Sequence, residues 1–141
     1  MVLDTAPTGH TLLLLDATGS YHREMLRRID SELVHRFTTP LMRLRDPAYT
    51  KILLVTLPET TPVSEASRLQ DDLRRAGIEP WAWVVNASLA ASATRDPLLV
   101  QRVLIELAQI ERVRALARRL AVVPWSPHEP RGLEALRALG R

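Results

Sequence analysis

The sequence contains no cysteine, and Lys51 is the only lysine among its 141 residues. Without cysteine, this chain forms no disulfides, holds no metal through thiolates and carries no cysteine nucleophile. A phosphate-binding loop needs a glycine-rich turn that ends in Lys followed by Ser or Thr. Lys51 is followed by Ile52 and has no glycine nearby. The 141 residues therefore lack the motif that would cradle the phosphates of a nucleotide.

Long apolar runs and basic stripes are also missing. No run approaches the roughly 20 residues of a membrane span, and no basic region precedes the short run at residues 12–15 as in a signal peptide. We therefore expect cytoplasmic residence. The net charge is only +3, aromatic residues make up 4% of the chain, and the arginines alternate with acidic residues. This composition favours solvated helix surfaces and no nucleic-acid partner.

The apolar pattern predicts strands that alternate with helices. We expect a parallel sheet with helices on both faces, in an α/β fold that forms one partial domain over residues 1–141. The expected strands are 1–4, 51–57, 81–86 and 121–124. The expected helices are 21–34, 61–76, 96–120 with a break near Gln109, and 130–139, and a short helix is expected between Pro40 and Asp46.

Apolar residues at spacings of three and four define the inward face of each expected helix. The long helix after Pro97 presents the stripe Leu99, Val103, Leu107, Ile110 and Val113. Leu133, Leu136 and Leu139 mark the inward face of the last helix, and Gly77 is expected to end the helix that starts at Thr61.

Chemistry in such a fold is expected beyond the carboxyl ends of the strands. Residues 4–11 read DTAPTGHT and connect a short apolar run to a loop with Pro and Gly. Asp4 could organise Mg²⁺ through a water or orient the attacking water, or it could be a helix cap or a surface acid. Gly9 could bring its N–H close to a terminal phosphate, or it could serve as a turn glycine. His10 could bind a metalloid, or it could simply hydrogen-bond within its loop.

Three later segments also end strands with polar or aromatic residues. The amide of Asn86 offers both a donor and an acceptor, which matches the edge of adenine. Pro124 and Trp125 could pack against a base, although Trp125 could equally cover the last helix. Glu59 could contact a ribose, contact an adjoining subunit or cap the following helix, and the sequence does not separate these alternatives.

The DTAPTGHT string, extended through residue 19, resembles the signature of the arsenite-pump-driving ATPases. The resemblance continues through residues 55–63, 72–78, 81–86, 94–99 and 123–125, and is strongest to the C-terminal half of that ATPase. It implies a fragment of a P-loop NTPase fold with a deviant phosphate loop. The family couples ATP hydrolysis to the efflux of arsenite and antimonite through a membrane permease. The relatives that target tail-anchored proteins are a weaker match.

Residue roles follow from this resemblance by position. Asp4 would belong to the Mg²⁺ and water motif, Thr5 to Gly9 would form the switch loop, and His10 would lie at or near the metalloid site. Asn86 and the segment Val123, Pro124, Trp125 and Ser126 would line the adenine pocket. ATP and Mg²⁺ would be the cofactors, arsenite or antimonite an allosteric metalloid, and the permease would draw the protein to the inner membrane.

The missing phosphate loop limits what this chain is expected to do alone. Phosphoryl transfer depends on the Lys and the backbone amides of that loop, so we expect an ATPase by resemblance that is inactive by itself. An unpaired sheet edge and an uncovered apolar surface should also remain. The expected partner is the missing ATPase portion or a full-length homologue. The alternative is a non-catalytic binding or regulatory module that pairs with a complete ATPase or with itself.

Overall fold

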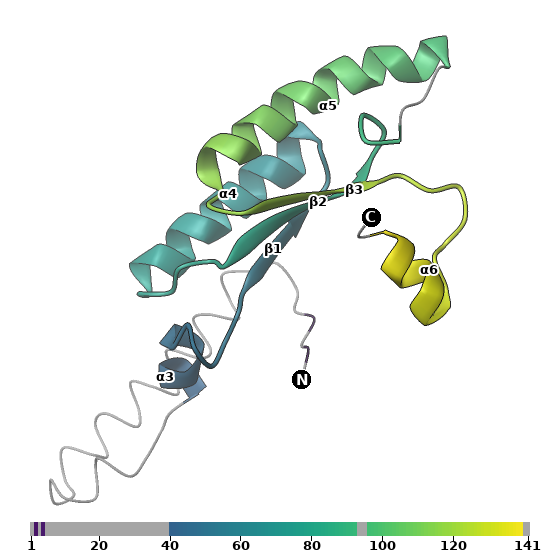
Figure 1. The fold of residues 1–141 in the computed structure, drawn as a ribbon. Coiled ribbons are helices and arrows are strands. Elements are labelled where there is room, and N and C mark those ends of the chain that lie inside the picture. Colours follow the sequence, from purple (N-terminus) through teal and green to yellow (C-terminus); the bar gives the residue numbers. More distant parts are fainter. Residues whose placement is uncertain (1, 3, 5–39, 93–95, 140–141) are drawn as a thin grey trace, which may run out of the picture. The chain divides into compact units, whose positions relative to one another are not determined.

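Three parallel strands form the centre of the computed structural model, which describes residues 2, 4, 40–92 and 96–139. They are β1 (Leu53–Thr56), β2 (Ala82–Ser88) and β3 (Leu120–Pro124), arranged in the order β1-β2-β3 (Figure 1). Leu53 of β1 lies opposite Ala82, and Trp83 of β2 lies opposite Leu120. The strands predicted at residues 51–57, 81–86 and 121–124 are thus confirmed, with shifted ends.

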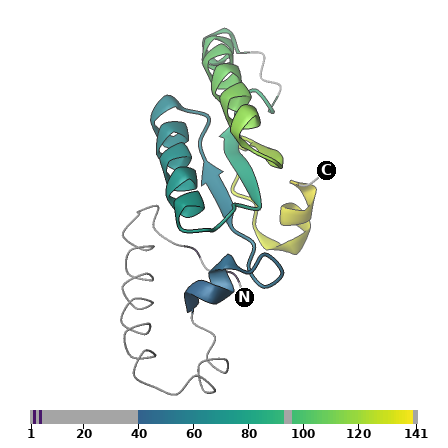
Figure 2. The same ribbon diagram turned by 90° about the vertical axis from the view of Figure 1, so that its left-hand side faces the viewer.

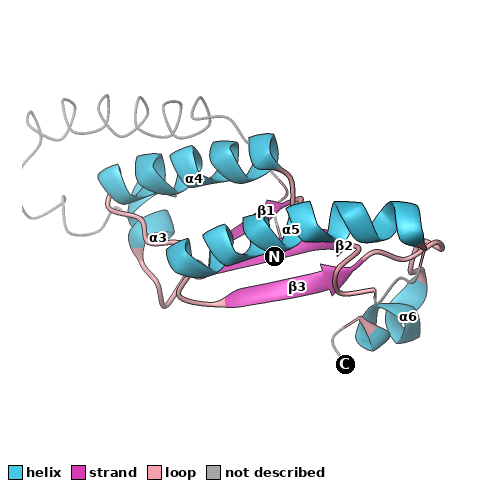
Figure 3. Cartoon of the chain, turned by 90° about the horizontal axis from the view of Figure 1, so that it is seen from above, coloured by secondary structure: helices cyan, strands magenta, loops and turns pink. Residues whose placement is uncertain are grey.

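Helices α4 (Thr60–Arg75) and α5 (Pro97–Leu116) follow β1 and β2. The first part of α4 and the whole of α5 lie on the same side of the sheet (Figures 2 and 3). Right-handed crossovers between strands in sequential order place both helices on one face. We call this the covered face. The sheet residues that it buries are Leu54 (4% exposed), Thr56 (5%), Trp83 (1%) and Val85 (0%).

The opposite face of the sheet, which we call the open face, carries the alternate residues of the same strands. Leu53 is 50% exposed and Val55 is 62% exposed, although both are apolar. The predicted parallel sheet flanked by helices is confirmed, and of the expected cover on both faces the described residues show α4 and α5 on one face. Within the described residues β1 pairs with β2 alone, so its other edge has no strand beside it.

The described residues fall into two units, and the boundary between them passes through α4. One unit comprises Leu53–Arg68 and Trp81–Arg141, and it contains the sheet, α5 and α6 (Gly132–Ala138). The other lies within Met1–Ile52 and Leu69–Pro80, and it contains the end of α4 and α3 (Pro40–Arg45), the short helix predicted before Asp46. The prediction of one domain over the chain stays a prediction.

Gly77 ends α4 as the sequence predicts. Its φ is +75°, and its N–H donates to the carbonyl of Arg74 over 2.9 Å. The N–H of Ile78 donates to the carbonyl of Leu73 over 2.9 Å, and both of these side chains are buried. This is a Schellman motif, and the two buried side chains occupy the positions that usually make its hydrophobic contact. A hydrogen bond from Arg74 to Glu79 in the same turn raises the pKa of the arginine.

Helix α5 begins at an N-cap and continues without interruption. Asp96 accepts hydrogen bonds from the amides of Leu98 and Leu99, and Pro97 occupies the first turn. The break expected near Gln109 is wrong, because α5 runs on to Leu116.

The predicted inward faces are confirmed in α5 at Ile110 and Val113, and are wrong at Leu107 and in α6. Leu107 is 45% exposed, and Glu106, Ile110 and Val113 are the buried residues of α5. In α6, Leu133 is 64% exposed and Leu136 is 54% exposed, because no described element covers this helix of seven residues. An apolar residue at the right spacing therefore becomes buried only where a neighbouring element is available.

The strand predicted at residues 1–4 is not observed at the two described positions. Val2 and Asp4 lie outside any helix or strand, and Val2 is 96% exposed. A short apolar run forms a buried strand only when neighbouring strands supply its hydrogen bonds. The helix predicted at residues 21–34 lies outside the described residues.

Candidate functional site

The candidate site is built at the carboxyl ends of β2 and β3. Val85 pairs with Val122, and Ser88 pairs with Pro124. Between these pairs β2 has two residues, Asn86 and Ala87, where β3 has one. The extra residue makes a β-bulge, and Ala87 adopts a φ of +55° there. An L-residue is disfavoured in this left-handed conformation, so the local backbone is strained.

The bulge brings several predicted site residues together. Asn86 lies beside Val123 in the register, and its side chain is exposed. The N–H of Trp125 donates to the carbonyl of Ser88 over 2.9 Å, which ties the end of β3 to the end of β2. Trp125 itself is 47% exposed. An exposed amide and an accessible indole ring thus both follow from residues at the ends of these two strands.

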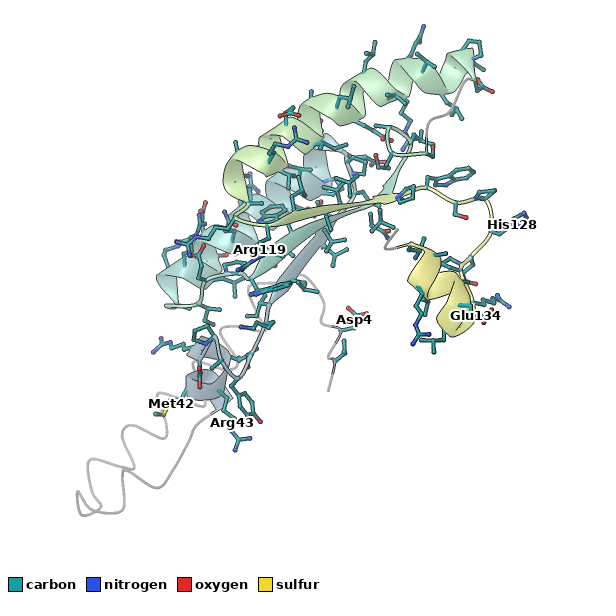
Figure 4. All side chains as sticks on the ribbon, in the orientation of Figure 1. Asp4, Met42, Arg43, Arg119, His128 and Glu134 are labelled. Atoms are coloured by element: carbon teal, nitrogen blue, oxygen red, sulfur yellow. The ribbon has the colours of Figure 1, made fainter. Side chains whose placement is uncertain are left out.

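Ser126 begins the loop that leads from β3 to α6. Its hydroxyl donates to the carbonyl of His128 over 2.8 Å, so the loop makes a local turn. His128 lies on this loop and Glu134 on α6, as Figure 4 shows. The Ser126 hydroxyl is therefore already engaged with its own loop.

The bulge also changes which face of the sheet Ser88 occupies. In regular alternation Ser88 would share a face with Val84, but one additional residue moves it to the covered face. Its exposure there is 0%, and its hydroxyl donates to Oε2 of Glu106 over 3.2 Å. Glu106 is 2% exposed and also accepts from the amide of Ala90 over 3.1 Å. Sequence reasoning missed both residues.

A signal for Glu106 does exist in the sequence. Glu106, Ile110 and Val113 follow one another at spacings of four and three, so they share one helix face. A carboxylate on an otherwise buried apolar stripe indicates a buried polar contact, because an unpaired buried charge is costly. The predicted inward stripe of this helix contains Leu107 instead, and therefore misses Glu106.

Glu59 extends the contacts toward β1. Its carboxylate binds Arg102 with an N–O distance of 2.7 Å, and Nε of Arg102 lies 4.0 Å from Oε1 of Glu106. The backbone carbonyl of Glu59 accepts from the amide of Val63 in the first turn of α4. Of the alternatives for Glu59, the structure bears on the helix cap, because its main-chain carbonyl contributes to the start of α4. Its side chain instead forms an ion pair within the chain, a contact that none of the alternatives named.

The residues predicted for Mg²⁺ and the phosphates are mostly not described. Thr5, Gly9 and His10 lie outside the described residues. Asp4 is exposed, and its side chain is labelled in Figure 4. Nζ of Lys51 donates to the carbonyl of Pro47. Within residues 40–92 and 96–139 no group of three or more His, Asp or Glu side chains could hold a metal ion.

Comparison with known proteins places this geometry in a family. The family model described as anion-transporting ATPase matches residues 16–141. The arsenical pump-driving ATPases of Acidiphilium multivorum and Escherichia coli are 60% and 59% identical to this chain over 140 residues. These alignments cover 99% of this chain but 24% of each relative. The ATPase GET3B of Arabidopsis thaliana is 27% identical over 173 residues, which is 42% of its length.

No described helix has the length and apolar character needed to cross a membrane. The parallel strands, the helices packed on them and the polar residues beyond the strand ends agree with a nucleotide hydrolase fold of the P-loop class. The match over most of the sequence and the high identity to several relatives make the assignment firm. This chain belongs to the anion-transporting ATPase family.

Proposed function

We propose that this chain supplies the adenine side of an ATP-hydrolysing site that is completed by other segments of a longer ATPase. The observation that carries the proposal is the bulge at Asn86 and Ala87, which presents an exposed amide beside Val123, two residues before the half-exposed Trp125. A base needs a face on which to stack and a donor–acceptor pair at its edge. Trp125 offers the first and Asn86 the second.

The phosphate side of the proposed site rests on the family and on residues 4–11. Asp4 would hold Mg²⁺ through a water, Thr5 to Gly9 would form the switch loop, and His10 would contact a metalloid. Bound Mg²⁺-ATP supplies the transferable phosphoryl group and the charge that the metal neutralises. The phosphate loop would come from a segment outside these 141 residues, because the chain spans 24% of its close relatives.

The relatives are described as driving an arsenical pump. By membership of the same family, we propose that the complete enzyme couples ATP hydrolysis to the export of arsenite or antimonite. Its partner would then be a membrane permease, which would hold a cytoplasmic ATPase at the inner membrane. Arsenite should accelerate ATP hydrolysis by the completed enzyme, and an arsenite titration of its ATPase rate tests this.

Calorimetric titration of the chain with Mg²⁺-ATP, adenosine and Mg²⁺-GTP tests the adenine proposal. Because the contacts proposed for Asn86 and Trp125 are to the base and not to the phosphates, ATP and adenosine should bind with similar affinity, and GTP should bind more weakly. Asn86→Ala should weaken adenosine binding by roughly five- to tenfold, the usual consequence of losing hydrogen bonds to a ligand.

Gln101→Ala removes another exposed side-chain amide, on α5, and serves as the matched control. It should leave adenosine binding unchanged. Equal affinity for adenosine in the native chain and in Asn86→Ala would contradict the assignment of Asn86. The absence of any binding by the folded chain would contradict the adenine proposal as a whole.

A pairing module is the second candidate function, and the open face of the sheet favours it. Leu53 and Val55 leave apolar surface exposed beside an edge of β1 that no described strand occupies. Pairing with a complete ATPase, or with a second copy, would cover this surface. Sedimentation shows whether the chain self-associates. Dose-dependent inhibition of a complete relative's ATPase activity would support pairing, whereas an unchanged rate would contradict it.

A further inference from the structure

Glu106 is a buried carboxylate that the proposed adenine contacts do not use. It lies in the middle of α5, on the face that packs over the sheet, and is 2% exposed. A buried carboxylate is tolerated when polar groups compensate it. Two donors reach its Oε2 atom, the hydroxyl of Ser88 at 3.2 Å and the amide of Ala90 at 3.1 Å. Nε of Arg102 lies 4.0 Å from Oε1.

These contacts converge on one turn, residues 89–92, which follows β2 directly. We call it the β2 turn. The hydroxyl of Ser88, which donates to Glu106, also accepts from the amide of Ala91 over 3.3 Å. The amide of Ser92 donates to the carbonyl of Leu89 over 3.1 Å and closes the turn. Glu106 and Ser88 therefore accept hydrogen bonds from two successive amides, those of Ala90 and Ala91. Without these acceptors, the partly buried amides would need water as a partner.

A second loop is connected to the same carboxylate. Arg102 stands one helical turn before Glu106 and binds the carboxylate of Glu59 over 2.7 Å. Glu59 lies between β1 and α4, where its carbonyl accepts from the amide of Val63. One face of α5 thus contacts the segments that follow both β1 and β2. In a parallel sheet these segments border the ligand site.

We propose that Glu106 is a positioning residue for the adenine contacts. It fixes the β2 turn against α5, and this holds the bulge in the conformation that exposes Asn86. The inference rests on the proposed function, because it assigns Glu106 a role at that same site. Ser88 connects Glu106 to the proposed adenine contacts, because its hydroxyl donates to Glu106 and its carbonyl accepts from the amide of Trp125. Loosening the β2 turn therefore releases both Asn86 and Trp125.

Amide hydrogen exchange on the whole chain tests the placement directly. In Glu106→Ala the amide of Ala90 loses its acceptor, so its exchange should accelerate on the order of tenfold. Amides within β1 should exchange as in the native chain. In Glu106→Gln the side-chain oxygen still accepts from Ser88 and Ala90, so exchange should stay near the native rate.

Ser88→Ala keeps the test decisive if Glu106→Ala does not fold. It removes the acceptor of the Ala91 amide and leaves Glu106 in place. Exchange should accelerate at Ala91 and much less at Ala90. Native exchange rates at Ala90 in a folded Glu106→Ala chain, or at Ala91 in Ser88→Ala, would overturn the inference.

Adenosine affinity, measured by calorimetry on the same variants, tests the link to the ligand. Affinity should fall about fivefold in Glu106→Ala and should recover in Glu106→Gln. A merely structural role would lower the melting temperature and leave the affinity of the folded fraction unchanged, and this result would overturn the inference while the proposed function stands. If the native chain binds no adenosine, the proposed function fails, and the role of Glu106 at that site fails with it.

Discussion

The covered and open faces of the sheet come from the same three strands and contain the same kinds of residues, but their exposure differs sharply. Leu54 and its neighbour Trp83 are 4% and 1% exposed, whereas Leu53 and Val55 are 50% and 62% exposed. A strand that is apolar at every position normally has both faces packed. The apolar residues on both faces of these strands fit a sheet that is packed on both sides. Helices α4 and α5 pack on one of these sides.

Replacing Trp83 by Ala should lower the free energy of unfolding more than any other change considered, because it removes the packing of the covered face. Trp83 fills the space beneath the helices, and truncating a buried Trp to Ala costs about 3–5 kcal/mol of unfolding free energy. Val55→Ala removes methyl groups from the open face and should cost less than about 1 kcal/mol. Urea unfolding followed by circular dichroism measures both. Equal losses would show that the open face is packed in solution, for example against a second copy.

Asp96→Ala tests whether the helix that covers the sheet depends on its cap. Asp96 accepts from the amides of Leu98 and Leu99 at 2.8 and 3.4 Å. Losing this N-cap should lower the unfolding free energy by about 1 kcal/mol. Glu111→Ala removes an exposed acid from the same helix and is the control, with an expected loss below about 0.5 kcal/mol. A cap variant as stable as the control would mean that packing alone sets the start of α5.

The order of strands and helices could be predicted from sequence because local signals mark it. Gly77 ends α4, Asp96 and Pro97 begin α5, and an apolar run marks each strand. Which faces would be covered could not be predicted, because this depends on neighbours rather than on the strand itself. For the same reason the inward face assigned to Leu133 and Leu136 was wrong. Spacing predicts which residues share a face, but not whether another element lies against it.

The candidate site was only partly predictable for a different reason. Asn86 and Trp125 stand next to apolar runs, so their place near strand ends could be predicted. The bulge at Ala87 has no sequence signal, because alanine rarely adopts a positive φ and glycine would be the expected residue. Without the bulge, the burial of Ser88 and its contact with Glu106 could not be inferred. The adenine role of Asn86 and the roles of Asp4, Thr5, Gly9 and His10 stay predictions.

Ala87→Gly sharpens the comparison at the point where Ser88 moves to the covered face. Glycine adopts a positive φ without steric cost, but it also gains entropy in the unfolded chain. The two effects oppose each other, so we expect a net stabilisation of about 0.5 kcal/mol. Ala87→Val should destabilise by at least about 1 kcal/mol, since a β-branched residue is strongly disfavoured there. Thermal unfolding of both variants checks the opposite signs, and a stabilising valine would contradict the strained bulge.

Glu59→Gln should have the smallest effect, because it changes only the rim of the covered face. The side chains of Arg102 and Glu59 are 58% and 46% exposed, and an ion pair this accessible is worth less than about 1 kcal/mol. The small loss should shrink further at high salt, where exposed charges are screened. Arg102→Gln should cost more, because it also removes a cation whose Nε lies 4.0 Å from Oε1 of the buried Glu106. Unfolding free energies of both variants at low and high salt separate these terms. Equal losses in Glu59→Gln and Arg102→Gln would show that the Glu59–Arg102 ion pair itself stabilises the covered face. The charge of Arg102 would then matter less to Glu106 than the hydrogen bonds that Glu106 accepts from Ser88 and Ala90.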